Sequence, residues 1–178
     1  MRNQKGFNFR FRLIESMLDV SLAIDFLSKQ DLRYPHYDDW VQRTEHEIKA
    51  GYKQAILAFS GHHLVGDLVY QPHKELSRVR EAKNMRIHPQ LRRRDFAHFM
   101  LRQVEEQDKE EFDAIMMDVR TDNQGPINFL TFCGYTPIAQ VNLYDRNCQD
   151  VIMVKCFNDT TKSGIVYNAQ QLVLGSSL

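Results

Sequence analysis

The stretch Met85–Met100, MRIHPQLRRRDFAHFM, decides the fold because it joins the end of a strand to the start of a helix. Pro89 ends the strand pattern, a short polar loop carries three arginines at 92–94, and an amphipathic helix begins near Ala97. The first turn of a helix leaves backbone N–H groups unpaired and concentrates partial positive charge, so this geometry suits an anion. Guanidinium groups add permanent charge that grips phosphate oxygens. Taken alone, the same loop also fits an ordinary solvated turn.

Hydrophobic periodicity on both sides of this stretch predicts a mixed α/β (α+β) fold. Strands are expected at 7–14, 53–59, 63–70, 76–88, 112–119, 136–144 and 150–157. Helices are expected at 17–29, 38–49, 97–109 and 125–133. The order gives antiparallel strands early in the chain and a strand–helix–strand unit in the middle.

The chain divides into one domain at 1–157 and a C-terminal segment at 158–178. The segment begins as a polar linker, and the apolar run IVYNAQQLVL beyond it is expected to form an added strand or a docked tail. Such a strand could pair with a neighbouring subunit, which makes a homodimer one expectation.

Composition excludes several classes of function. Among 178 residues, Lys plus Arg and Asp plus Glu number 23 each, whereas a protein that coats nucleic acid usually has a basic excess. No run approaches the roughly 20 apolar residues that span a bilayer, and residues 1–12 show no signal-peptide pattern. The three cysteines include no C-x-x-C pair, which favours a reducing compartment, by default the cytoplasm. No histidine or cysteine spacing indicates a metal site.

The arginine loop resembles a known motif. Arg92-Arg93-Arg94-Asp95-Phe96-Ala97 is similar to the acetyl-CoA loop of GNAT N-acetyltransferases, Gln/Arg-x-x-Gly-x-Gly/Ala, which follows a strand ending in Pro. The first and last positions match, while Asp95 replaces the middle glycine. Asp tolerates unusual backbone angles better than most residues, so the loop is still expected to form.

A second segment supports the same resemblance. Residues 123–135, NQGPINFLTFCGY, are similar to the family pattern Asn-x-x-Ala-x-x-x-Tyr-x-x-x-Gly-Phe. Asn123, Gly134 and the aromatic Tyr135 match, whereas Pro126 replaces the Ala and Leu130 replaces the Tyr. Asn123 is also an ordinary helix-cap candidate, and Gly134 an ordinary helix terminator.

The resemblance implies a mostly antiparallel central sheet flanked by helices, with the strand at 82–88 splayed from the strand at 112–119. It also implies acetyl-CoA as co-substrate, with the pantetheine arm in the opening and no metal. The implied cofactor-binding residues are Met85, Arg86, Ile87, Arg92, Arg93, Arg94, Asp95, Phe96, Ala97 and Asn123. A backbone N–H in this strand would polarise the thioester carbonyl.

The implied reaction is direct attack of an amine on the thioester, and the amine must first lose a proton. Glu81 and Asp118 are the carboxylates best placed to accept it, and His88 is a third candidate. Because Leu130 stands where the family has the tyrosine that protonates the thiolate, Tyr135 is a candidate for that role. Tyr144 and Cys133 are alternatives.

The acceptor is expected between the two early helices and the late strands. Acidic and aromatic residues there could receive a cationic amine on a small molecule or a protein, namely Tyr37, Asp38, Asp39, Trp40 and Tyr144. Two other functions stay open at this point. One is a degenerate GNAT fold that binds acyl-CoA, or nothing, as an interaction module; the other is nucleic-acid binding through the arginines.

Overall fold

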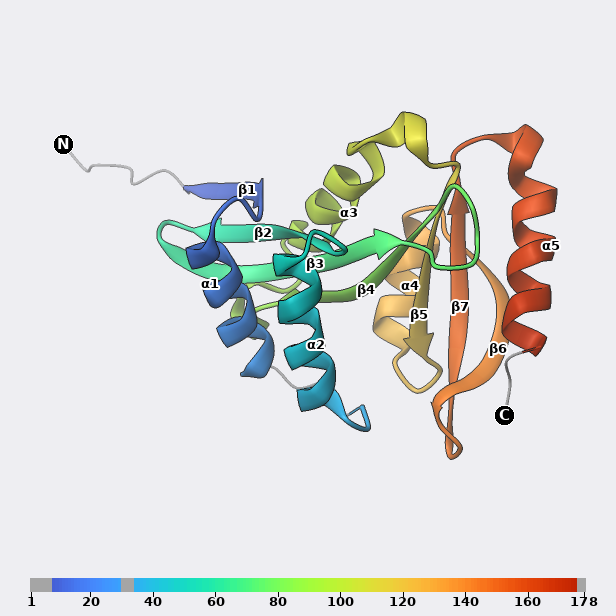
Figure 1. Cartoon of the computed structure of the whole chain (residues 1–178), viewed down its shortest axis with the longest axis horizontal. Coiled ribbons are helices and arrows are strands. Elements are labelled where there is room, and N and C mark those ends of the chain that lie inside the picture. The colour runs from blue at the N-terminus through green and yellow to red at the C-terminus, as the bar shows by residue number, and fades with distance from the viewer. Residues whose placement is uncertain (1–7, 30–33, 176–178) are drawn as a thin grey trace.

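Seven strands form one mixed sheet in the computed structural model, which describes residues 8–29 and 34–175 (Figure 1). The strands are β1 (Phe9–Leu13), β2 (Gln54–Ser60), β3 (His63–Pro72), β4 (Val79–Ile87), β5 (Ala114–Arg120), β6 (Thr136–Asp145) and β7 (Cys148–Cys156). Their order across the sheet is β1-β2-β3-β4-β5-β7-β6. Only β4 and β5 pair in parallel, so the predicted mostly antiparallel sheet is confirmed.

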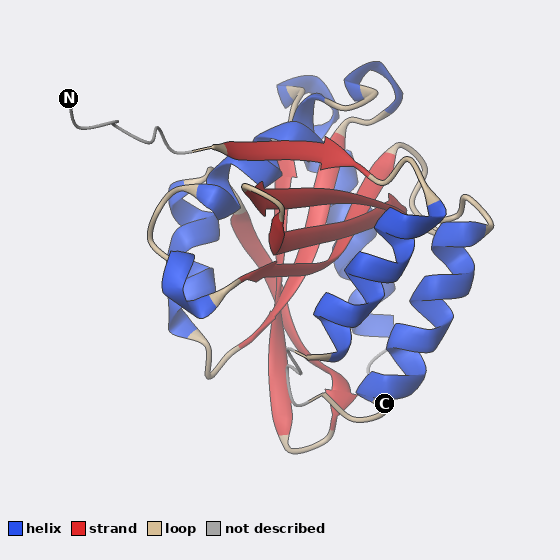
Figure 2. Ribbon diagram, turned by 90° about the vertical axis from the view of Figure 1, so that its left-hand side faces the viewer, coloured by secondary structure: helices blue, strands red, loops and turns tan. Residues whose placement is uncertain are grey.

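Helices cover both faces of this twisted sheet (Figure 2). They are α1 (Met17–Ser28), α2 (Tyr37–Lys49), α3 (Phe96–Glu106), α4 (Gln124–Phe132) and α5 (Asp159–Gly175), with 3₁₀ turns η1 (Pro89–Leu91) and η2 (Lys109–Glu111). Each strand and helix predicted between residues 8 and 157 is present, with ends shifted by a few residues. Residue 7 of the first predicted strand lies outside the described residues. No described helix is both long and apolar enough to cross a membrane.

The central strands are apolar on both faces because each face meets a separate helical layer. In β2, Leu57 and Phe59 pack with α1 and α2 on one face, while Ile56 packs on the opposite face with α3. The run at 112–119 behaves in the same way. Met116 points to the cluster under α5, and Met117 to the main core under α3.

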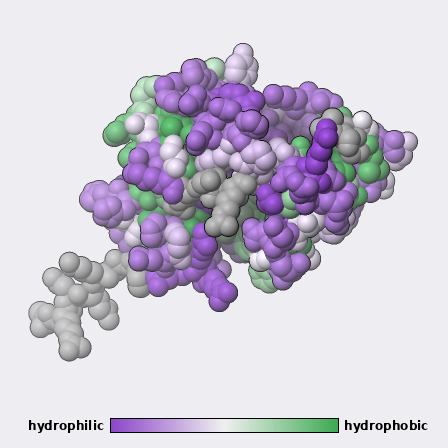
Figure 3. All heavy atoms as spheres, turned by 90° about the horizontal axis from the view of Figure 1, so that it is seen from below, coloured by the Kyte–Doolittle hydropathy of each residue, from purple (hydrophilic) through white to green (hydrophobic). Residues whose placement is uncertain are grey.

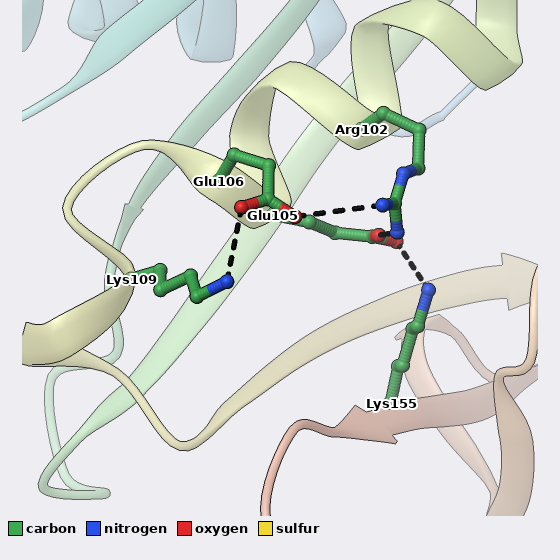
Figure 4. A network of polar contacts seen from close by, with 5 residues as sticks. All are labelled: Arg102, Glu105, Glu106, Lys109 and Lys155. Atoms are coloured by element: carbon green, nitrogen blue, oxygen red, sulfur yellow. Dashed lines mark hydrogen bonds and ion pairs between the residues drawn. The ribbon is translucent and has the colours of Figure 1, made fainter.

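Polar contacts fix the position of α3 on the sheet. Arg80 of β4 is buried and donates to the carbonyls of Val104 and Gln107 at the end of α3, both at 2.6 Å. Glu105 lies between Arg102 and Lys155, with a distance of 2.8 Å from each cationic group to a carboxylate oxygen (Figure 4). Since Lys155 belongs to β7, this network ties α3 to a strand on the far side of β5.

The C-terminal prediction of a linker and a strand is wrong. Residues 159–175 form α5, which packs beside β6 and β7 (Figure 1). The polar start is a helix cap, because the Asn158 side chain accepts from the Thr160 N–H at 3.0 Å. Ile165, Ala169 and Val173 recur every four residues and face the sheet, which is helical and not strand periodicity. Residues 176–178 of the predicted tail lie outside the described residues.

Candidate functional site

The candidate site begins where β4 leaves β5. Val69 of β3 pairs with Asn84 and the next residue, Tyr70, pairs with Ala82, so Lys83 is an extra residue in β4. Such a β-bulge bends the strand that carries it. The parallel pairing of β4 with β5 ends at the same place, with Ala82 opposite Met117. The bulge therefore accounts for the predicted splay, and an opening lies between 83–87 and 118–120.

Backbone groups of β4 face this opening. The His88 N–H donates to the Val65 carbonyl at 2.7 Å. Because bonded and non-bonded pairs alternate along an antiparallel ladder, Arg86 forms the next bonded pair with β3. Met85 and Ile87 consequently direct their N–H and C=O groups away from β3. Of the three strand residues predicted to contact the cofactor, Met85 presents its N–H and C=O to the opening and Ile87 its N–H, whereas the Ile87 carbonyl accepts from Arg92 Nε.

The side chain of Arg86 points elsewhere. It lies in a buried network in which its Nε donates to the Asn84 side chain at 3.0 Å, and Asn84 donates to Asp67 at 2.8 Å. An Arg86 Nη donates to the Tyr37 hydroxyl at 3.1 Å, and that hydroxyl donates to the Leu27 carbonyl at 3.0 Å. Burial raises the pKa of Asp67 to about 7, although the bond from Asn84 opposes this. The network links the splayed strand to the start of α2.

The arginine loop leaves the same strand and opens α3. Arg93 and Asp95 both have left-handed backbones, with φ of 61° and 59°. Asp95 thus adopts the conformation that the family's glycine would favour, as its tolerance of positive φ predicts. Its side chain makes no cap bond to the helix. The side chains at 92–94 are exposed and form no ion pair with any described residue; Arg92 Nε donates to the Ile87 carbonyl at 3.3 Å. Charge and helix N–H groups therefore converge on one open surface.

The second motif forms α4 on the other side of the opening. Asn123 precedes the helix, makes no side-chain cap bond and lines the cleft described below. Gly134 ends the helix with φ of 90°, as predicted, and the Tyr135 N–H returns to the Leu130 carbonyl at 3.0 Å. Leu130 is fully buried and borders the cleft.

Tyr135 lies away from the two candidate bases. It is 2% exposed within the main core, does not line the cleft, and its hydroxyl has no hydrogen-bond partner among the described residues. The structure therefore does not bring Tyr135 together with Glu81 and Asp118. The sequence could not show this, because the first residue after a helix terminator points in or out according to how the next strand packs.

A cleft of about 530 Å³ passes through the opening from the α2 side of the sheet to the α4 side. On the α2 side it is bordered by the segment before α2, by α2 itself and by the β3–β4 loop. On the α4 side it reaches Met85, Met117, Val119 and the start of α4. Seen from below, the molecular surface is mainly hydrophilic, and apolar residues form only small separate patches (Figure 3).

Asp118 is the cleft carboxylate with the most perturbed environment. Burial raises its pKa to about 6, nearby Asp150 and Glu81 act in the same direction, and Lys83 opposes them. The nearby Tyr144 hydroxyl also lowers this pKa. Burial, followed by the Asp118 charge, raises the pKa of Tyr144, so this phenol stays protonated near neutrality.

Glu81 is held differently. Its carboxylate accepts from the Gln71 side chain at 3.1 Å and from the Lys83 ammonium group. Both candidate bases, Glu81 and Asp118, line the same cleft. His88, the third candidate, does not line the cleft, and its ring accepts from the Gln90 N–H at 3.4 Å.

The predicted acceptor residues divide into two groups. Tyr37, Trp40 and Tyr144 line the cleft, whereas Asp38 and Asp39 are exposed and lie outside it. Tyr34 also lines the cleft and meets Tyr144 edge to face, with ring centroids 5.2 Å apart.

The sequence did not predict the charged residues that line the cleft, among them Lys53 and Lys83. Their positions carry no motif. Only the tertiary packing of α2 on β2 and β4 brings them together. No group of three or more His, Cys, Asp or Glu side chains in the described part of the chain could hold a metal ion.

Comparison with known proteins agrees with this geometry. A model of the Acetyltransferase (GNAT) family matches residues 16–135, which include both sequence motifs. A Desulfovibrio desulfuricans protein assigned to the GNAT family is 13% identical with a TM-score of 0.73, covering 84% of this chain and 99% of that one. The ribosomal-protein-S18-alanine N-acetyltransferase of Escherichia coli is 13% identical with a TM-score of 0.69, covering 85% and 95%.

A chain of the NatC complex bound to Gag peptide and CoA is 13% identical with a TM-score of 0.67, covering 85% of this chain and 99% of its own. At such identities the solved structures show a shared fold and nothing about the acceptor. No curated protein sequence matches this chain at a significant level.

Proposed function

Since this chain belongs to the GNAT family of acetyltransferases and is therefore an acyltransferase, we propose that it moves an acetyl group from acetyl-CoA to a primary amine by direct attack. The observation that carries the proposal is the cleft through the β4–β5 opening, together with the arginine-rich helix start that follows β4 in the chain. Acetyl-CoA supplies an activated acyl group. The residues of this chain bind the co-substrate, orient the amine and accept its proton.

The opening fits the co-substrate at two points. The backbone N–H and C=O of Met85 and the N–H of Ile87 can pair with the pantetheine amides, and one N–H can stabilise the oxyanion that develops on the thioester carbonyl. Phe96 and Ala97 begin α3 with unpaired N–H groups, and the guanidinium groups at 92–94 stand just upstream, where a diphosphate would be neutralised. Asn123, whose side chain is not used as a cap, can contact the arm from the α4 side.

Asp118 is the residue we assign as proton acceptor. It lies immediately after Met117, the last residue of β5 that pairs with β4, and it lines the cleft where these two strands part. A carboxyl group with a pKa of about 6 is mostly ionised at neutral pH, yet is more basic than an ordinary aspartate. Glu81 is tied to Lys83 and Gln71, which suits a role in orienting the acceptor.

The departing thiolate does not depend on the family's tyrosine. Leu130 occupies that position and only packs. A thiol with a pKa near ~8.5 leaves as thiolate without much penalty close to neutrality. Tyr144 is the protonated phenol nearest to Asp118 and can return a proton from the acceptor side.

The pH dependence of thiol release tests this assignment. With acetyl-CoA and a panel of primary amines, kcat/KM of the wild type should fall as pH drops through about 6, because Asp118 is then protonated. Asp118→Asn should lower kcat/KM by roughly 10²–10⁴-fold and remove that limb. Asp25→Asn, the same change on exposed α1, is the matched control. Unchanged rates and pH profile in Asp118→Asn would reject the assignment. Absence of both thiol release and any acetyl-CoA melting shift would reject the function.

The cytoplasm stays the predicted compartment, and the absence of a C-x-x-C pair supports it. Strand exchange no longer supports the expected homodimer, because the segment expected to add a strand to a neighbouring subunit forms helix α5.

A further inference from the structure

Most cationic side chains that line the cleft are already paired. Lys53 lies 2.6 Å from Glu47, and Lys83 contacts Glu81. Arg120 lies 3.5 Å from Asp122. These three cations are therefore neutralised by carboxylates of the protein, and they leave little net charge for a ligand.

Arg43 and Lys74 are the exceptions. Both line the cleft and are exposed, and neither forms an ion pair or hydrogen bond with any residue of 8–29 or 34–175. Arg43 lies on α2, whereas Lys74 lies on the loop between β3 and β4. They nevertheless stand close to one carboxylate, since both lower the pKa of Glu47, which Lys53 already occupies. Two unneutralised cations from separate elements thus converge on one rim.

Glu47 of this rim is paired with Lys53, so among the described residues Glu75 is the remaining rim carboxylate that opposes Arg43 and Lys74. It is exposed beside Lys74 and has no ion pair among the described residues. The rim therefore keeps a positive excess of one charge after Glu75 is counted. The other end of the cleft carries a negative group, because the Asp118 carboxylate lies there with the phenols of Tyr34 and Tyr144. The cleft is bipolar.

We infer that the acceptor is a small primary amine whose own chain carries an anionic group, carboxylate or phosphate. The amine lies toward Asp118 and the anion lies between Arg43 and Lys74. This inference rests on the proposed function, since it names the substrate class of the same site. A plain alkylamine would contact Asp118 but would leave Arg43 and Lys74 solvated by water.

Binding of matched ligand pairs tests the inference without requiring turnover. Each pair differs in the anion: β-alanine against propylamine, lysine against cadaverine, and phosphoethanolamine against ethanolamine. Calorimetry with the full chain saturated with CoA gives a Kd for each. The anionic member should bind more tightly in at least one pair, and the pairs separate carboxylate from phosphate. Arg43→Gln and Lys74→Gln should each weaken the anionic member about threefold, and the double variant about tenfold, with the neutral member unchanged.

Lys49→Gln is the matched control, because it removes a lysine from the same helix outside the cleft. Equal affinity within all three pairs overturns the inference, as does a double variant that weakens both members of a pair equally. Failure of the proposed function is read separately, as absent CoA binding or absent thiol release with every amine. Selective loss of the anionic member in the double variant supports the charged rim in either case.

Discussion

The N-termini of α1 and α3 face the same physical problem, because the first turn of any helix leaves backbone N–H groups without helical acceptors. At α1 the protein supplies the acceptors itself. The Ser16 side chain accepts from the Asp19 N–H at 3.2 Å, and the Asp19 carboxylate accepts from the Ser16 and Glu15 N–H groups, both at 3.1 Å. Arg12 then donates to the same carboxylate at 2.7 Å. Asp19 is 2% exposed, so this terminus is closed.

At α3 the corresponding groups are left open. Asp95 occupies the cap position with a left-handed backbone and makes no cap bond. The arginines just before it are exposed and form no ion pair within the described chain. The two termini therefore differ in who supplies the acceptors. At α1 the protein's own side chains supply them and stabilise the fold, whereas at α3 we propose that a bound ligand supplies them.

The largest expected effect comes from neutralising the open terminus. Replacing Arg92, Arg93 and Arg94 together by Gln should weaken acetyl-CoA about a hundredfold, because each charge-assisted contact to phosphate contributes on the order of 1 kcal/mol or more. The free energy of unfolding should change by less than about 0.5 kcal/mol, since the three side chains are exposed. Calorimetry and urea unfolding measure the two quantities. If the triple variant lost stability but kept its affinity for acetyl-CoA, the arginines would serve the fold and the α3 terminus would not be the open one.

The closed terminus should give the opposite result. Asp19→Asn removes the ion pair with Arg12 and weakens the acceptor for two N–H groups. The hydrogen bond from Arg12 is the main reason that the pKa of Asp19 falls to about 2. The shift from 3.8 corresponds to about 2 kcal/mol, which urea unfolding at neutral pH should show as lost stability. Acetyl-CoA affinity should stay the same. Asp39→Asn, an exposed aspartate in the first turn of α2, is the control.

The same aspartate predicts a pH dependence. Its folded-state pKa lies below the unfolded value, so its contribution is fully present above about pH 4 and is lost as pH falls toward 2. The stability difference between wild type and Asp19→Asn should therefore shrink across that window. A difference that stays constant from neutral pH to about pH 2 would show that the carboxylate charge is not what closes α1.

Ser16→Ala should cost less, about 1 kcal/mol, because it removes one neutral cap bond and leaves Asp19 with Arg12. The loss should appear in urea unfolding and leave acetyl-CoA binding unaffected. Ser28→Ala, at the exposed C-terminal end of the same helix, provides the comparison. Equal losses from both variants would mean that the cap is no stronger than an ordinary surface hydroxyl.

The sequence predicted these termini unequally well for a physical reason. Residues 92–96, RRRDF, form a loop whose backbone conformation depends mainly on these residues themselves. The open terminus of α3 could therefore be predicted from a few residues. The Ser16 cap is local too, because Ser16 directly precedes the helical pattern of 17–29. The Arg12 contact with Asp19 is not local, because it depends on how β1 turns into the helix. Periodicity gave the strands and the first four helices, since their buried faces are regular.

Non-local features could not be read in the same way. The bulge at Lys83 has no sequence signal, yet it sets where the cleft opens. The pKa of Asp118 depends on burial, on Lys83 and on Tyr144, which comes from a distant strand. The sequence wrongly predicted a strand where α5 lies. Its β-branched residues favour a strand, whereas the four-residue spacing of its apolar residues favours the helix that forms.

The smallest expected effect concerns Asp95 itself and sharpens the comparison most closely. Asp95→Gly gives the residue type that the left-handed backbone favours and removes a negative charge beside the proposed phosphate site. Relief at positive φ and the greater freedom of glycine in the unfolded chain oppose each other, so stability should change by less than about 1 kcal/mol. Acetyl-CoA affinity should rise a fewfold, because like charge is removed. Asp95→Asn separates the two causes, since it removes the charge and keeps the side chain. If both variants bind acetyl-CoA more weakly, the Asp95 carboxylate orients the neighbouring guanidinium groups, and the terminus of α3 is partly closed by the protein.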